Sequence, residues 1–126
     1  MAAEVHLTGM TEDEFKTFTK KLALQVIELF QDQKFRGKNR ILADQLIQSV
    51  TTMAAMYRSA CRERTTSTLL TRLLQVEAET ERSLFILELF VDSNVLRPEQ
   101  LIDITGDLDE ILRLTSSSIV AISRKQ

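Results

Sequence analysis

Hydrophobic residues recur at spacings of three and four along most of this chain, which is the period of an amphipathic helix. The first such stripe is Phe15, Phe18, Leu22, Val26 and Leu29, widened by Ala23, Ile27 and Phe30. Thr11 precedes it, and Glu14 follows Thr11 by three residues, which is the spacing of a capping box. Asp13 adds negative charge at the positive end of the helix dipole. The pattern therefore predicts a helix that begins just after Thr11.

Later segments repeat this period. The second stripe is Leu42, Leu46, Val50, Met53, Tyr57 and Ala60. The third is Leu69, Leu73, Val76, Thr80, Ser83, Leu87 and Phe90. The fourth is Leu101, Ile104, Leu108, Ile111, Thr115, Ile119 and Ile122. No strand-like alternation competes with these stripes, so the sequence predicts an all-α protein.

Polar segments separate the stripes and supply helix signals. The run 31–38 is polar and ends the first helix, and Asn39 is in place to cap the second. Thr65 or Thr66 offers the cap of the third helix. Pro98 stands where the first residue of the last helix is expected.

Matched lengths and short connections predict one antiparallel up-down-up-down four-helix bundle. Each helix is expected to have about 22 to 26 residues, or roughly 35 Å at 1.5 Å per residue. The bundle domain spans 11–126 and follows a mobile N-terminal tail, 1–10, which shows no period. Gly106 lies inside the last helix, where glycine costs about 1 kcal/mol relative to alanine. Gly106 therefore indicates either that the helix bends there or that a neighbouring helix needs the space that a side chain would fill.

Composition agrees with a folded domain. The chain has 126 residues, and its 44% hydrophobic content is too high for a disordered protein. Cys61 is the single cysteine, so no internal disulfide forms. Glu4 and His6 interrupt the first residues, and no apolar run follows that fits a signal peptide or a membrane span. The expected location is therefore the cytoplasm.

The sequence shows little catalytic chemistry. Its one histidine, His6, lies in the predicted tail, so the Glu-x-x-His pairs of di-metal bundles are missing. Glu77 and Glu81 share a helix face, and a solvated acidic surface is favoured over a metal or acid–base pair. We expect no metal and no cofactor.

Cys61 is the one candidate nucleophile. Arg62 and Arg64 stand near it and are able to lower a thiol pKa, but no histidine partner accompanies it. A packed small side chain is the favoured interpretation over a reactive thiol. No glycine-rich phosphate loop or Ser-His-Asp set is present, so we expect the protein not to be an enzyme.

Charge is distributed unevenly, although the net charge is only −2. Up-down topology places one basic cluster at one end of the bundle: Lys34, Arg36, Lys38 and Arg40. It gathers a second at the other end: Arg58, Arg62, Arg64, Arg124 and Lys125. Either cluster is able to meet nucleic-acid phosphates, or simply to complement helix dipoles and aid solubility. The first cluster is the better candidate because dipole placement does not account for all of it.

Apolar residues also lie off the main stripes. They are Ile47, Met56, Leu70, Leu74, Leu84, Ile86, Leu89 and Leu114. Phe85, one turn from Leu89, adds to a second face on the third helix. This surplus favours self-association over a wide core in a monomer. The candidate interface residues are Leu70, Leu74, Leu84, Phe85 and Leu89.

The middle of the chain resembles a known family. The stretch from Gln45 to Ala60 (QLIQSVTTMAAMYRSA) is similar to the Q-L-x-R-S-x-x-S-I-x-A-N-x-A-E-A pattern of the bacterial four helix bundle proteins. That family includes proteins encoded in 23S rRNA intervening sequences and resembles the accessory variability determinants of diversity-generating retroelements. The segments 77–80 (EAET) and 96–99 (LRPE) fit it as well, and the resemblance covers about residues 15–123. Gln45 and Thr52 match the motif, and Glu79 matches its E-A-x-E-T signature by composition.

The resemblance implies a homopentamer of bundles around a central channel. For the retroelement branch it also implies a basic surface that binds nucleic acid and a reverse transcriptase. We therefore predict a non-enzymatic, homo-oligomeric binding or scaffold subunit, with nucleic acid or a nucleoprotein as its ligand and no membrane partner. The alternative is a structural adaptor that binds a protein partner and has no nucleic-acid role.

Overall fold

The computed structural model describes residues 9–125, and within this range the chain folds into four α-helices and one short 3₁₀ turn. The α-helices are α1 (Glu12–Gln31), α2 (Lys38–Ala60), α3 (Thr66–Asp92) and α4 (Ile102–Arg124). The 3₁₀ turn η1 (Pro98–Leu101) leads into α4. Most of the range predicted as a mobile tail, including His6, lies outside the described residues. Met10, at its end, is half-buried against the core.

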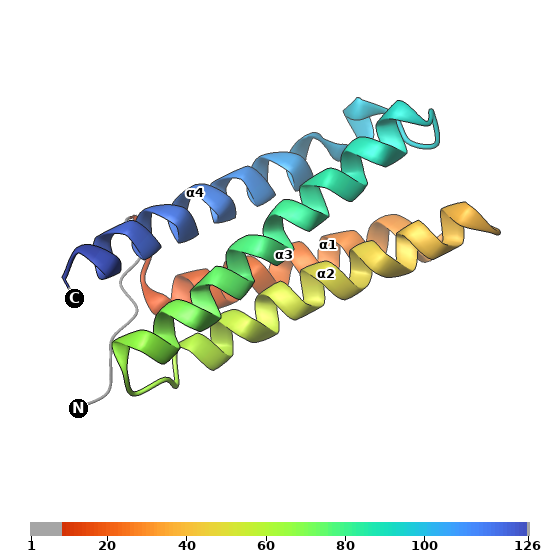
Figure 1. Ribbon diagram of the computed structural model, residues 1–126. Helices are drawn as coiled ribbons and strands as arrows, with labels where there is room; N and C mark the ends of the chain where they lie inside the picture. Colours follow the sequence, from red (N-terminus) through yellow and green to blue (C-terminus); the bar gives the residue numbers. More distant parts are fainter. Residues whose placement is uncertain (1–8, 126) are drawn as a thin grey trace.

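Successive helices run in opposite directions, as Figure 1 shows, so the predicted all-α antiparallel bundle is confirmed. The contact between α2 and α3 is the most extensive, and that between α1 and α4 is the smallest among neighbouring helices. The connections α1–α2 and α3–α4 lie at one end of the bundle (Figure 1). The connection α2–α3 and the C-terminal end of α4 lie at the other.

Two of the predicted helix starts are confirmed. The Thr11 hydroxyl accepts a 3.1 Å hydrogen bond from the Glu14 amide, and the Glu14 carboxylate accepts one from the Thr11 amide. Thr65 caps α3 in the same manner, because its hydroxyl accepts a hydrogen bond from the Thr68 amide. Both side chains satisfy backbone donors that the first turn of a helix leaves free.

The other two predicted starts are wrong by a few residues. Gly37, rather than Asn39, is the N-cap of α2, with φ of 58°. Glycine adopts this backbone conformation without strain, so the chain turns there and Asn39 is already helical. Pro98 begins the 3₁₀ turn, in which the Gln100 side chain accepts a hydrogen bond from the Arg97 amide. The α-helix itself starts only after that turn.

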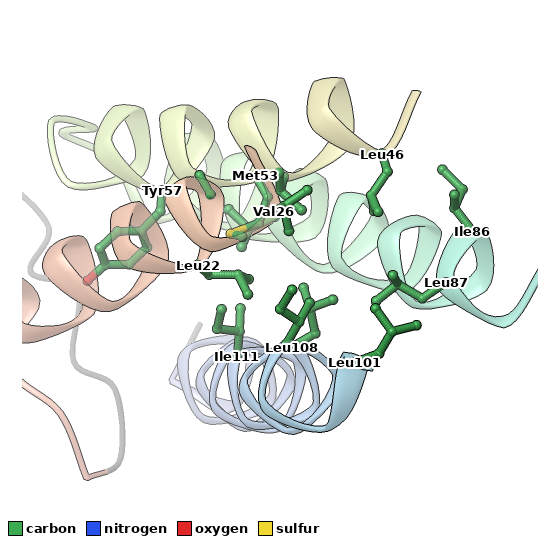
Figure 2. Packing of buried hydrophobic residues seen from close by; sticks show 14 of the residues in the cluster. Leu22, Val26, Leu46, Met53, Tyr57, Ile86, Leu87, Leu101, Leu108 and Ile111 are labelled. Carbon is green, nitrogen blue, oxygen red and sulfur yellow. The ribbon is translucent and has the colours of Figure 1, made fainter. Parts of the chain in front are cut away.

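The core lies along the bundle axis between the predicted stripes. Figure 2 shows Leu22 of α1 pointing toward Leu108 and Ile111 of α4, and all of these side chains are fully buried. Ile86 and Leu114 were expected off the stripes but are 3% and 1% exposed. Each of the four helices contacts two neighbours, so its buried face is wider than one stripe of side chains. For these two residues the monomer core, and not a subunit interface, provides the burial.

Phe35 joins the core from a segment that the sequence indicated as polar. Its ring lies 5.7 Å from that of Phe30 and 5.9 Å from that of Phe90, measured between centroids. Aromatic pairs at such distances stabilise beyond simple area burial. The connection between α1 and α2 is therefore anchored to the C-terminal turn of α3.

Gly106 needs no space inside this chain. A Cβ atom built on it would meet nothing within 4 Å, and the residue is exposed on α4. The predicted explanation that a neighbouring helix requires the room is therefore wrong within the described residues.

Small polar side chains form part of the buried interior. They are Thr19, Ser49, Thr80, Ser83, Thr115 and Ser118. Thr80 donates a 2.7 Å hydrogen bond to the carbonyl of Val76, one turn earlier on α3. The hydroxyls of Ser49 and Thr115 are buried and have no hydrogen-bond partner in the described part of the chain. An unsatisfied buried hydroxyl destabilises the fold because it loses its bonds to water.

This difference predicts opposite effects for two matched substitutions. Thr115→Val replaces the unpartnered hydroxyl by a methyl group of similar shape and should raise the free energy of unfolding by about 1 kcal/mol. Thr80→Val removes a hydroxyl that is hydrogen-bonded, and this should lower the free energy of unfolding by about 1 kcal/mol. Urea denaturation of both variants, with unchanged m-values, measures these shifts. A loss of stability in Thr115→Val would contradict the assignment of its hydroxyl as unsatisfied.

Candidate nucleic-acid and self-association surfaces

The first basic cluster surrounds the connection between α1 and α2. Lys34 and Arg36 lie in the connection, on either side of the anchored Phe35, while Lys38 and Arg40 begin α2. All four basic side chains of the cluster are exposed. Arg40 pairs with Asp44 at 3.2 Å, and the other three form no ion pair within residues 9–125.

Helix electrostatics do not explain this placement. The N-terminus of a helix carries partial positive charge, so cations there are unfavourable. Lys38 and Arg40 nevertheless occupy the first turn of α2, and that turn contains no acidic residue. A basic turn at a helix start costs some local stability. This makes the cluster a stronger candidate for binding an anion than its charge alone indicates.

The second basic cluster has a simpler explanation. Arg58 and Arg124 lie in the last turns of α2 and α4, where positive charge complements the helix dipole. Arg62 and Arg64 lie in the α2–α3 connection, and Lys125 follows α4 at the same end of the bundle (Figure 1). All of these side chains are exposed. Their positions fit solvation and dipole complementarity at least as well as phosphate binding.

The candidate interface residues on α3 separate into two groups. Leu74 and Phe85 are 50% and 57% exposed, and both lie on the side of α3 that faces away from the core. Leu84 is half-buried against the core, while Leu70 and Leu89 are half-buried as well. The outward apolar surface of α3 thus centres on Leu74 and Phe85, which we name the α3 outer face.

Exposed apolar side chains on other helices were not among the sequence candidates. Ile41 of α2 is 57% exposed and Ile102 of α4 is 66% exposed. Ile102 stands in the first turn of α4, at a position that the expected longer helix would have placed in its second turn. The sequence placed the start of α4 too early. For that reason Ile102 was not identified as an exposed residue.

The residues that match the family motif lie on two helices. Gln45 and Thr52 are half-buried on α2, and Glu79 is half-buried on α3. The backbone carbonyl of Glu79 accepts a hydrogen bond from the Ser83 hydroxyl. Within the described residues, no hydrogen bond joins the motif side chains to one another.

Glu77 has a structural role that the sequence did not reveal. The Ser116 hydroxyl of α4 donates a 2.6 Å hydrogen bond to the Glu77 carboxylate of α3. This bond ties α3 to α4 partway along their length. Glu81, one turn later, is exposed. On the acidic face expected from the sequence, the Glu81 side chain is therefore exposed to water, whereas the Glu77 carboxylate is hydrogen-bonded to Ser116.

The Cys61 thiol is less acidic than its arginine neighbours suggested. Burial raises the pKa of Cys61 to about 11, against an ordinary value of 9.0. Tyr57, one turn earlier, is fully buried, and burial also raises its pKa. Arg62 and Arg64 are exposed, where water screens their charges. Desolvation of the thiol therefore outweighs the pKa-lowering effect that the sequence allowed for these arginines.

The described residues contain neither a cluster of metal ligands nor a helix able to cross a membrane. Within residues 9–125, no three His, Cys, Asp or Glu side chains come together in a group able to hold a metal ion. No helix in this range has both the length and the apolar character that crossing a membrane requires.

Comparison with known proteins supports the fold. A crystal structure of a protein with unknown function from the S23 ribosomal protein family of Bacteroides thetaiotaomicron matches with a TM-score of 0.74. The two chains are 23% identical, and the match covers 82% of this chain and 96% of the other. No family model and no curated protein matches this sequence. At this identity the likeness shows a shared helical fold.

The pKa of Cys61 predicts slow thiol chemistry. Because its pKa is about 11, the thiolate forms only as the pH rises toward that value. At pH 8 the folded protein should react with iodoacetamide roughly 100-fold more slowly than the urea-unfolded chain, as two pKa units imply. Mass spectrometry of the alkylated product measures both rates, and Cys61→Ser is the blank. Faster reaction of the folded protein would show that the arginines control the thiol after all.

Proposed function

We propose that this protein is a non-enzymatic, homo-oligomeric scaffold subunit that binds nucleic acid or a nucleoprotein through the connection between α1 and α2. The observation that carries the proposal is the exposure of Lys34, Arg36 and Lys38, none of which forms an ion pair within residues 9–125. Free cations of this kind bind phosphates by releasing condensed counterions. The net charge of −2 means that binding depends on this local cluster.

The geometry of the connection supports this function. Phe35 is anchored against Phe30 and Phe90, so its neighbours Lys34 and Arg36 extend from a fixed point of the backbone. A fixed arrangement of cations loses less conformational entropy on binding than a floppy one. The likeness to a member of a family named for a ribosomal protein, and the motif resemblance in α2, also favour a nucleic-acid or nucleoprotein ligand.

Self-association completes the proposal. Leu74 and Phe85 leave large apolar area in water on the α3 outer face, and such area is typical of subunit interfaces. The motif resemblance makes five copies the proposed number. Several copies would present several basic connections together, and this avidity would strengthen weak phosphate contacts.

Removing the basic connection should abolish nucleic-acid binding. In fluorescence anisotropy with labelled RNA and DNA, the wild-type protein should bind at low salt and weaken steeply as salt rises. The variant K34A/R36A/K38A/R40A should lose binding by at least about tenfold. The control R58A/R62A/R64A/K125A loses the same charge from the other end and should bind nearly as the wild type does. Equal losses in both variants would contradict the proposed site, and a flat salt titration of the wild type would favour the adaptor alternative.

The α3 outer face should control assembly. Size exclusion with light scattering should give the wild type about five times the monomer mass, and L74Q/F85Q should reduce the mass to that of the monomer. The control L24Q/I41Q removes two comparably exposed side chains, at 49% and 57%, and should leave the assembly intact. A wild-type monomer at high concentration would reject the assembly.

A further inference from the structure

A groove of about 680 Å³ lies between the C-terminal half of α3 and the beginning of α4. Its apolar lining consists of Leu84, Leu87, Val91, Leu101 and Ile102, together with Pro98. Figure 2 shows Leu87 and Leu101 next to each other, where α3 meets the start of α4. Ile102 is 66% exposed, the largest exposed fraction among the big apolar side chains of the described chain. Ile102 therefore leaves apolar surface in contact with water at the groove, whereas Leu87 and Leu101 are 3% and 2% exposed.

The charged residues of the groove all have the same sign. Glu88 and Asp92 line it from α3, and Asp109 lines it from α4. No lysine or arginine belongs to its lining, and none of these three carboxylates forms an ion pair within residues 9–125. The groove thus combines an apolar surface with an uncompensated negative charge. It attracts cationic ligands and repels phosphates.

Gly106 gives independent support for an occupant. It lines the groove from the interior of α4, where glycine is an unfavourable residue. Nothing in the chain uses the room that its missing Cβ leaves, since a Cβ would meet no atom within 4 Å. Glycine at such a position permits close approach of another backbone. The vacant space faces the groove, so a bound partner would be the element that uses it.

From these features we infer that the groove docks an amphipathic helix of another protein, with apolar anchors on one face and lysine or arginine residues beside them. Two antiparallel helices with an apolar groove between them accept a third helix, as in other helix-in-groove complexes. The stretch from Leu84 to Asp92 rises about 12 Å at 1.5 Å per residue, which matches two turns of the docked helix. Its basic residues face Glu88, Asp92 and Asp109, and its backbone crosses at Gly106.

The basic connection of a second copy would fit the groove less well than such a helix. The basic connection has the right charge, but Phe35 within it is already packed against Phe30 and Phe90. That leaves Ile41 as the exposed large apolar side chain beside the basic residues. One such residue does not supply the repeated anchors that a groove of this length accommodates. The acidic groove and the basic connection are therefore separate binding surfaces.

The test uses a defined probe. It is a fluorescein-labelled helical peptide of about 18 residues, with leucines at i, i+3, i+4 and i+7 and flanking lysines and arginines. Anisotropy should show saturable binding to the full-length wild-type protein. Ile102→Ser, which removes the exposed anchor, and Gly106→Met, which fills the vacant space, should each weaken binding by about tenfold or more. Gly106→Ala should weaken binding by a smaller factor while raising the melting temperature, because alanine is the better helix former.

Charge is tested with two matched variants. E88Q/D92N/D109N removes the carboxylates of the groove and should weaken binding by about tenfold and flatten its salt dependence. E28Q/D32N/E81Q changes the net charge by the same amount at exposed positions outside the groove lining and should bind within about twofold of the wild type.

The outcomes distinguish this inference from its rivals. Unchanged binding in both Ile102→Ser and Gly106→Met would place the peptide elsewhere and overturn the inference. Equal weakening of peptide binding by the two charge variants would also overturn the inference, because it would show that the peptide responds only to the net charge of the protein. If Gly106→Met instead reduced the mass of the free protein in light scattering, a second copy would be the occupant. All of these variants keep the basic residues of the connection and both Leu74 and Phe85, so the proposed function stands or falls separately.

Discussion

The fold depends on the burial of α3 between two neighbours. Helix α3 makes the most extensive contact with α2 and a further large contact with α4, so its apolar face is wider than one stripe of side chains. Ile86 and Thr80, in different turns of α3, are 3% and 0% exposed. An isolated helix of this length is marginal in water, and packing of this kind supplies most of its stability. The helices that flank α3 are held in register by the same contacts.

Aromatic pairs secure the connections to this core. Phe35 packs with Phe30 and Phe90 where α1 passes into α2. Elsewhere in the core, the ring centroids of Phe15 and Tyr57 lie 4.5 Å apart. This contact joins the first turn of α1 to the last turn of α2. The α1–α2 connection is short and has a half-buried anchor, so its backbone is held in a defined position. Phe35 therefore links the stability of the core to the arrangement of the basic cluster.

Sequence periodicity predicted the elements well because each helix buries a face in the same core. The caps at Thr11 and Thr65 were also predictable, since each is a local hydrogen bond between residues three apart. Local rules failed at Asn39, where the positive φ of Gly37 turned the chain first. Phe35 was missed because periodicity detects core residues inside helices and not in the connections. The pKa of Cys61 required knowledge of burial, which no neighbouring residue in the sequence reveals.

The net charge of −2 conceals two local fields of opposite sign. Lys34 and Arg36 stand in the α1–α2 connection, while Asp92 and Asp109 line the groove beside the α3–α4 connection, at the same end of the bundle (Figure 1). At physiological ionic strength, exposed charges are screened over about 8 Å, so a ligand responds to the groups that it touches more than to the total. As proposed, the basic connection would bind anions, and the groove would bind cations that carry apolar surface. One end of a nearly neutral bundle thus carries two surfaces of opposite charge.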